Sequence, residues 1–350
     1  MVKDMDNRIN LNNFDIRTDL IIDSYNNILD DVKLNKQVYD KKDIHVTRIE
    51  VSDDNYKYFN KDKGKYITIE FPDITNYEDR ELLGNVLEEE LKWLYKSLGI
   101  NDNDECLIVG LGNENSTPDS LGPKALKNIL VTRHLFLLSK ENVKKGMRNV
   151  SIFAPNVMGN TGLESADIIL GIARDIKPKF IIAIDALASN SISRINRTIQ
   201  ITDSGIHPGS GIGNNRKEIS KNTIGIPVIA IGIPTVVDVS TVIGDTINYL
   251  YKHISYIKNN YNENKLVVTR KNYLKKIENN DLSIDERKAL GGLLGELDEN
   301  ELKELFNEVL TSIDYNMMVT VKEIDFIIEK LAIVVSSAIN NSLHLEVDNY

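Results

Sequence analysis

The sequence has very little cysteine and no long apolar run. Its 350 residues include one cysteine, Cys106, which excludes an internal disulfide and fits a reducing compartment such as the cytoplasm. Cys106 opens the apolar run Cys106–Val109, so we expect a small buried residue rather than a nucleophile. No run approaches the roughly 20 apolar residues of a membrane-spanning helix, and the polar first residues predict no signal peptide. We therefore expect no membrane association.

Positive charge and metal-binding motifs are also scarce. Lys and Arg number 42 against 52 Asp and Glu, which gives a net charge of −10. Broad nucleic-acid binding needs an excess of basic residues, so we predict no direct nucleic-acid partner. The sequence lacks His-Glu-x-x-His, a Cys/His cluster and Gly-x-Ser-x-Gly, and with them the usual signatures of zinc peptidases and serine hydrolases. We expect no metal and no other cofactor.

Short apolar segments alternate with helical patterns in the middle of the chain. The predicted strands are Cys106–Val109, Ser151–Phe153, Phe180–Ile184 and Val228–Ile231, and the predicted helices are Leu121–Leu137, Leu163–Asp175 and Val239–His253. This alternation predicts an α/β fold with a mostly parallel sheet covered by helices on both faces.

Further strands and helices flank this core. The strands are Ile44–Val51, Lys65–Phe71 and, as an antiparallel strand at the sheet edge, Arg197–Thr202; the helices cover residues 78–98, 281–310 and 320–345. Thr320 and Glu323 have the spacing of a capping box. Residues 255–280 are polar and predict a surface excursion.

Two aspartates occupy positions where an open α/β sheet binds its ligands. Asp119 lies in the loop after the first core strand, and Asp185 ends the run Phe180–Ile184. If the two carboxyl groups meet, they can share a proton, so that one activates water while the other polarises a carbonyl. Each aspartate could instead cap a helix or pair with a cation, and the local sequence leaves these alternatives open.

The loop that carries Asp119 contains Gly112, Asn113 and Thr117, which we expect to shape a binding site. It is not a dinucleotide-binding fingerprint, because Asn115 occupies the third glycine position of Gly-x-Gly-x-x-Gly.

Two other loops contain candidate substrate-binding residues. Gly159 lies in the loop over residues 154–162, which could present backbone donors to a peptide or an oxyanion. His207 lies in the glycine-rich loop over residues 203–214 and could contact a substrate. For both loops a purely structural role is the more common outcome.

Together these residues resemble the spore germination protease family, endopeptidases that degrade small acid-soluble spore proteins. The resemblance covers nearly the whole chain and includes the motifs Leu107–Asn113, Thr117–Asp119, Ile184–Ala188, Gly205–Gly211 and Gly225–Gly232. It implies an atypical aspartic endopeptidase, related in fold to the hydrogenase maturation proteases, with Asp119 and Asp185 as its catalytic pair. Asn156 stands where the family pattern has glycine.

The resemblance also implies a zymogen that cleaves itself near its N-terminus, works in the spore core and assembles as a homotetramer. Its partners would be the small acid-soluble spore proteins. The stretch Phe14–Leu20 resembles the processing site, which predicts cleavage between Asp19 and Leu20. The predicted organisation is a pro-segment over residues 1–19 and a single α/β peptidase domain over residues 20–350, with C-terminal helices over residues 281–345.

Three alternatives remain open at this point. The first is a processing protease of the hydrogenase-maturation type, which would need a metal-sensing acid and a histidine in the cleft. The second is a non-catalytic ligand-binding module on the same sheet, and the third is a structural spore protein. The position of Asp119 relative to Asp185 separates the aspartic peptidase from the binding module.

Overall fold

The computed structural model describes residues 19–25, 35–56, 59, 61–209, 216–259, 281–313 and 317–345. The chain divides into two compact units. The larger unit contains Arg17–Ser189, Ser193–Val236 and Thr320–Tyr350, and the smaller contains Met1–Ile16, Asn190–Ile192 and Val237–Val319. The first 18 residues of the predicted pro-segment and residues 260–280 of the polar excursion lie outside the described part.

Within the described residues, nine strands form one sheet in the order β1-β2-β3-β7-β8-β6-β4-β5, with β9 paired to β8 off this path. The strands are β1 (Asn35–Lys41), β2 (Ile44–Val51), β3 (Gly64–Glu70), β4 (Cys106–Gly110), β5 (Val150–Phe153), β6 (Phe180–Ser189), β7 (Thr198–Thr202), β8 (Val228–Asp238) and β9 (Met318–Val319). β4 pairs in parallel with β5 and β6, whereas β1, β2, β3, β7 and β8 pair antiparallel in succession. The α/β class is confirmed, with a mixed sheet.

Helices account for most of the remaining described residues. In the larger unit they are α1 (Ile21–Tyr25), α2 (Tyr77–Ser97), α3 (Leu121–Leu126), α4 (Arg133–Leu138), α5 (Met158–Thr161), α6 (Ser165–Ile176), α7 (Lys221–Ile224) and α12 (Ile324–Leu343), with 3-10 turns η2 (Thr117–Asp119) and η3 (Lys140–Asn142). In the smaller unit they are α8 (Val239–Asn259), α10 (Ile284–Gly291), η6 (Gly292–Glu296) and α11 (Glu299–Ser312). The turn η4 (Ile192–Arg194) joins the units in sequence.

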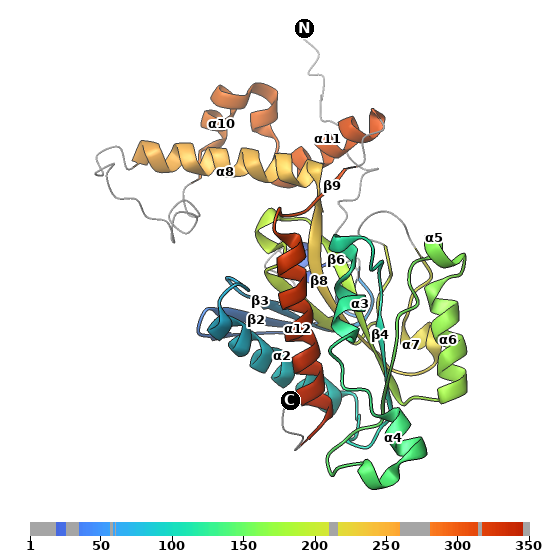
Figure 1. The fold of residues 1–350 in the computed structure, drawn as a ribbon. Coiled ribbons are helices and arrows are strands. Elements are labelled where there is room, and N and C mark those ends of the chain that lie inside the picture. The colour runs from blue at the N-terminus through green and yellow to red at the C-terminus, as the bar shows by residue number, and fades with distance from the viewer. Residues whose placement is uncertain are drawn as a thin grey trace. The chain divides into compact units, whose positions relative to one another are not determined.

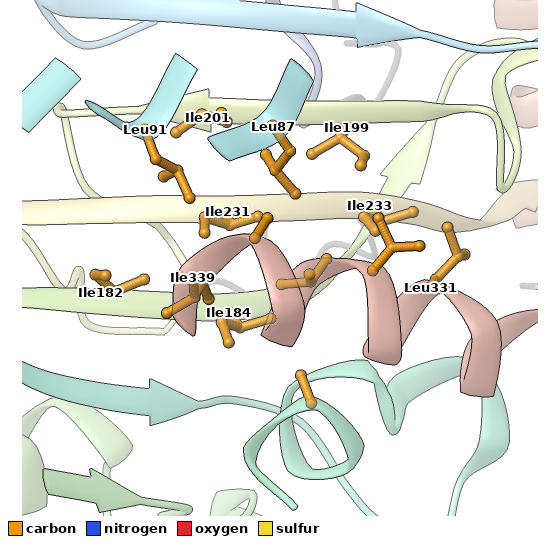
Figure 2. Packing of buried hydrophobic residues seen from close by; sticks show 14 of the residues in the cluster. Leu87, Leu91, Ile182, Ile184, Ile199, Ile201, Ile231, Ile233, Leu331 and Ile339 are labelled. Carbon is orange, nitrogen blue, oxygen red and sulfur yellow. The ribbon is translucent and has the colours of Figure 1, made fainter. Parts of the chain in front are cut away.

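Side chains on the central strands alternate between two apolar layers. Even-numbered Ile182 and Ile184 of β6 join α2, α3 and α12, which lie together in Figure 1. Figure 2 shows this layer, in which Leu87 and Leu91 of α2 and Leu331 and Ile339 of α12 pack over isoleucines of β6, β7 and β8. Odd-numbered Ile181 and Leu187 join the layer that contains α6 and α7. Because successive strand residues face opposite sides, Asp185 faces the α6 layer.

The helix α12 is the one described helix long and apolar enough, by length and composition, to span a membrane; its mean hydropathy is 1.3. Its buried residues, among them Ile328 and Val335, belong to the core layer with α2 and α3. Core helices of globular proteins share this composition, so the packing accounts for it.

Two expected strand positions are wrong. The strand β6 continues to Ser189, so Asp185 lies within the strand and does not end it. The segment Arg197–Thr202 forms β7 as an antiparallel strand, but between β3 and β8 rather than at the sheet edge. The polar strand β1 was not expected, because its exposed side chains carry no apolar alternation.

Three expected helix features are also wrong. The expected helix over residues 281–310 is interrupted, because α10 ends at Gly291, the 3-10 turn η6 follows and α11 begins only at Glu299. The pattern Leu121–Leu137 forms two short helices, because the Leu130 N–H donates to Asn340 Oδ1 of α12 (2.9 Å) instead of continuing the helix. Thr320 does not cap α12: its Oγ1 donates to the Thr235 carbonyl (2.6 Å), and Glu323 itself occupies the N-cap.

Candidate active site

Asp185 lies just beyond the point where its neighbouring strand ends. Ile184 pairs with Gly110, the last residue of β4, and β6 continues alone past it on that side. The side chain is 5% exposed, and the Ala186 N–H donates to its Oδ1 (2.9 Å). Burial, together with the negative charges of Asp119 and Asp19, raises the pKa of Asp185 well above its usual 3.8. Burial of this side chain therefore favours the neutral form of its carboxyl group.

Asp119 ends the short turn η2, and the same loop supports its carboxylate. The Asn113 N–H donates to Asp119 Oδ2 (2.8 Å), and Thr235 of β8 donates through Oγ1 to the Pro118 carbonyl (2.7 Å). Burial raises the pKa of Asp119 from 3.8 to about 6, and the hydrogen bond from Asn113 opposes this rise. Asp119 is thus mostly ionised at neutral pH.

Two glycines allow the loops that carry the aspartates to meet. Gly112 has φ 101°, and a Cβ there would lie 2.0 Å from the Asp119 carbonyl oxygen. A Cβ on Gly122, at the start of α3, would lie 2.6 Å from the Ile184 carbonyl oxygen. Any larger side chain would separate Asp119 from Asp185. The structure therefore brings together the two aspartates that the sequence singled out, and the charge of one raises the pKa of the other.

The predicted processing bond lies against the same strand. The Asp19 N–H donates to the Ala188 carbonyl (3.2 Å), and the Ala188 N–H donates to Asp19 Oδ2 (2.9 Å). Leu20 is fully buried in the apolar layer that contains Leu187. The Asp19 charge also contributes to the raised pKa of Asp185, so the bond and the two aspartates occupy one site.

Charged groups surround this N-terminal stretch. Asp23, in α1, forms an ion pair with Arg194, and Arg194 also lies 3.6 Å from Glu70. Burial lowers the pKa of Lys61, while the charges of Asp19 and Asp62 act in the opposite direction. The acidic residues at both ends of the stretch 19–23 therefore each lie near a basic side chain.

The other predicted loop residues have separate surroundings. Thr117 begins η2, and its carbonyl accepts from Ser120 Oγ (2.7 Å). Asn160 Nδ2 donates weakly to Asn113 Oδ1 (3.4 Å), which links the loop of Asp119 to the loop of Gly159. Gly159 itself is exposed within α5, and a Cβ there would meet nothing within 4 Å.

Asn156 has φ 63°, a left-handed conformation that asparagine tolerates better than most residues with a side chain. This explains why it can stand where the family pattern has glycine.

His207 lies in a different cluster from the aspartate pair. Its Nε2 lies 2.7 Å from Asp62 Oδ2 and 3.7 Å from Glu218 Oε2. Ligand atoms of these three residues lie within 4.8 Å of one another, so they have the chemistry to hold a metal ion. His207 and Asp62 are exposed, and their direct hydrogen bond accounts for the arrangement without an ion.

Comparison with known proteins identifies the family. The family model described as germination protease matches residues 17–350. The chain belongs to the germination protease family. It is 44% identical to the germination protease of Priestia megaterium, with 98% of each chain covered, and 42% identical to that of Bacillus subtilis, with 97% of this chain and 96% of the relative covered. The family resemblance predicted from the motifs is confirmed, and the chain is a protease.

A solved structure gives a more distant similarity. The [NiFe] hydrogenase maturation protease HycI from Thermococcus kodakarensis KOD1 matches with a TM-score of 0.27 and 18% identity, over 42% of this chain and 80% of that one. This similarity says nothing about activity.

Some site residues have no motif that would reveal them. Gln200, Ala188 and Arg194 all bind the N-terminal stretch, but Gln200 and Ala188 lie 179 and 169 residues from their partners in sequence. Cys106 is buried as expected, and burial raises the pKa of its thiol.

Proposed function

We propose that this germination protease is a self-processing aspartic endopeptidase that uses Asp119 and Asp185 to activate one water molecule. The observation that carries the proposal is the contact of the predicted processing bond with β6: Asp19 and Ala188 exchange two hydrogen bonds on the strand that carries Asp185, and the charges of Asp119 and Asp19 both raise the pKa of Asp185. A catalytic pair and the carboxyl side of the predicted processing bond therefore interact within one chain.

The difference in burial assigns the roles, because Asp185 is buried and Asp119 is only partly buried. Asp119, with a pKa of about 6, is the ionised base that takes a proton from water. Asp185, whose pKa burial and the Asp119 charge raise well above 3.8, is the neutral acid that donates to the scissile carbonyl and then supplies the proton for the departing amine. Because the two groups interact, they titrate as a pair.

This assignment sets the pH dependence of self-cleavage. Asp119 must be ionised, so the rate falls as the pH drops below about 6. Asp185 must be protonated, so the rate falls again as the pH rises above its raised pKa. Cleavage rates measured across this range test the bell shape; a rate that keeps rising into acid would reverse the roles.

The bond between Asp19 and Leu20 is the proposed processing site, and small acid-soluble spore proteins are the proposed substrates in the spore core. Both follow from the family resemblance, as does the homotetramer. Light scattering coupled to size-exclusion chromatography tests the assembly, and N-terminal sequencing of the mature chain tests the cut.

The decisive experiment is intact-mass spectrometry of purified chains over time, with and without a spore-protein substrate. Asp119→Asn and Asp185→Asn are each expected to abolish self-cleavage and substrate cleavage. The control is Asp175→Asn, an exposed aspartate on α6, which should process at the wild-type rate. Retained cleavage in either site variant rejects its role.

The metal-dependent alternative rests on the cluster of Asp62, His207 and Glu218. It predicts that a chelator stops cleavage and that His207→Ala does the same. The aspartic mechanism predicts that both treatments leave self-cleavage intact.

A further inference from the structure

The side-chain amide of Gln200 binds the chain on both sides of the proposed processing bond. Its Nε2 donates to the Asp19 carbonyl (3.1 Å), and its Oε1 accepts from the Ile21 N–H (2.7 Å). A carbonyl only accepts and an N–H only donates, so the two partners fix the orientation of the amide. Gln200 therefore spans the peptide bond between Asp19 and Leu20.

The strand around Gln200 holds its side chain in place. β7 pairs with β3 on one side and β8 on the other, and Gln200 itself is 6% exposed. Its neighbours Ile199 and Ile201 face the α2 layer, so Gln200 faces the opposite side, as Asp185 does. A glutamine fixed in this way is a preorganised donor.

The neighbouring strands provide the space for this arrangement. Gln200 pairs in register with Gly232 of β8, and a Cβ on Gly232 would lie 2.3 Å from Leu187 Cδ1 of β6. Leu187 thus lies over Gly232, next to Ala188, which binds Asp19.

We propose that Gln200 is a catalytic residue of self-processing, whose Nε2–H stabilises the negative charge that develops on the Asp19 carbonyl oxygen. The inference rests on the proposed aspartic mechanism. In the addition step, the water oxygen bonds to the Asp19 carbonyl carbon, the carbonyl electron pair moves to its oxygen, and the water proton goes to Asp119. In the second step the bond to the Leu20 nitrogen breaks, and the nitrogen takes the proton of Asp185.

Gln200 acts on the same oxygen as Asp185, from a different strand. Gln200 of β7 already donates to it in the structure, and on the proposed mechanism Asp185 of β6 donates to it as well. Its second bond, to the Ile21 N–H, fixes the amine side, so that the carbonyl stays aligned as water adds. Removal of one such donor from a protease typically slows the chemical step by about 10²–10³-fold.

The test compares Gln200→Met with Thr198→Val by the single-turnover rate of self-cleavage, followed by intact mass. Thr198 is the matched control: it lies on the same face of the same strand, is 1% exposed, and its Oγ1 has no described hydrogen-bond partner. We expect Gln200→Met to slow cleavage by about 10²–10³-fold and Thr198→Val to leave it unchanged. A Gln200→Met chain that cleaves at the control rate overturns the inference.

A second variant separates the donor from a simple anchor. Gln200→Glu keeps the acceptor for Ile21 but donates to the Asp19 carbonyl only while protonated. Relative to the wild-type rate at each pH, its rate should be low or should fall as pH rises. An anchor without a catalytic role gives a different result. Gln200→Met would then be slow only because residues 19–25 become protease-sensitive, and Gln200→Glu would cleave itself at the wild-type rate up to pH ~9. These two results together would show that the inference is wrong.

Failure of the broader mechanism gives a different pattern. Asp185→Asn in the same assay should show no self-cleavage. If Asp185→Asn cleaves itself, the aspartic mechanism is wrong whatever Gln200 does. If Asp185→Asn is inactive while Gln200→Met is as fast as Thr198→Val, only the role of Gln200 is wrong.

Discussion

The raised pKa of Asp119 predicts that its ionised carboxylate destabilises the folded chain. Burial raises the pKa from 3.8 to about 6, so the folded state holds the proton more tightly than the unfolded state does. At about 1.4 kcal/mol per pKa unit, the ionised group lowers the free energy of unfolding by about 3 kcal/mol. This is an upper value, because the side chain is only partly buried.

The sign of the effect sets its pH window. Below about pH 4 both states are protonated, and Asp119 has no effect on stability. Between about pH 4 and pH 6 only the unfolded state ionises, so the destabilisation grows as the pH rises. Above about pH 6 both states are ionised, and the destabilisation is constant.

The change to make is Asp119→Asn in the Asp185→Asn background. The background variant removes the second titrating carboxyl group, and by the proposed mechanism it cannot cleave itself. Asparagine keeps an oxygen that accepts from the Asn113 N–H, so the substitution removes the charge and retains the hydrogen bond. The pair of chains therefore differs only in the ionisation of residue 119.

Urea unfolding followed by circular dichroism, in steps from about pH 4 to pH 8, measures the difference. The double variant should match the background near pH 4 and be more stable by up to about 3 kcal/mol above pH 6. A difference that does not vary with pH, or a less stable double variant at pH 7, would refute the reasoning. Asp175→Asn, an exposed aspartate, should change the free energy of unfolding by less than about 0.5 kcal/mol at every pH.

Three other substitutions test the supporting structure. Gly112→Ala should abolish self-cleavage, because the added Cβ displaces Asp119, the proposed base. Gly99 also has positive φ, but a Cβ there meets nothing within 4 Å, so Gly99→Ala should still cleave itself in the same mass assay. Glu90→Gln removes the charge of a fully buried carboxylate from its bidentate ion pair with the partly exposed arginine of β2, and should lower the free energy of unfolding by about 3 kcal/mol in urea titrations. Asp23→Asn should cost about 1–3 kcal/mol by the same measurement, because it leaves Arg194 without its nearest carboxylate.

The sequence predicts the core of the fold where periodicity is strong. The apolar strands β4 and β5 and the helices α2 and α6 appear close to their expected positions, because their burial pattern follows directly from their composition, whereas β8 begins at the expected Val228 but continues past Ile231 to Asp238. It fails where tertiary contacts override local preference. The Thr320 hydroxyl donates to the Thr235 carbonyl instead of capping α12, and no local sequence pattern predicts this contact.

The aspartates are predictable from sequence, but their support is not. Asp119 and Asp185 stand out because a charge interrupts a glycine-rich loop or an apolar run. Gln200 is a polar residue in a strand of alternating polarity, and this pattern predicts a side chain that faces water. It becomes notable only because the N-terminal stretch folds back over β7, a contact between residues about 180 positions apart.

The burial of Leu20, Ile21 and Ile22 has a consequence for the kinetics of maturation. On the proposed mechanism the bond between Asp19 and Leu20 already lies beside the catalytic groups of the same chain. The reaction is therefore first order, and its half-time is independent of protein concentration. The tethered segment also competes with any other polypeptide for the proposed active site, at an effective concentration near the millimolar range. On this mechanism, cleavage releases the residues before the cut as a separate fragment. The first substrate of the enzyme is then its own N-terminal segment.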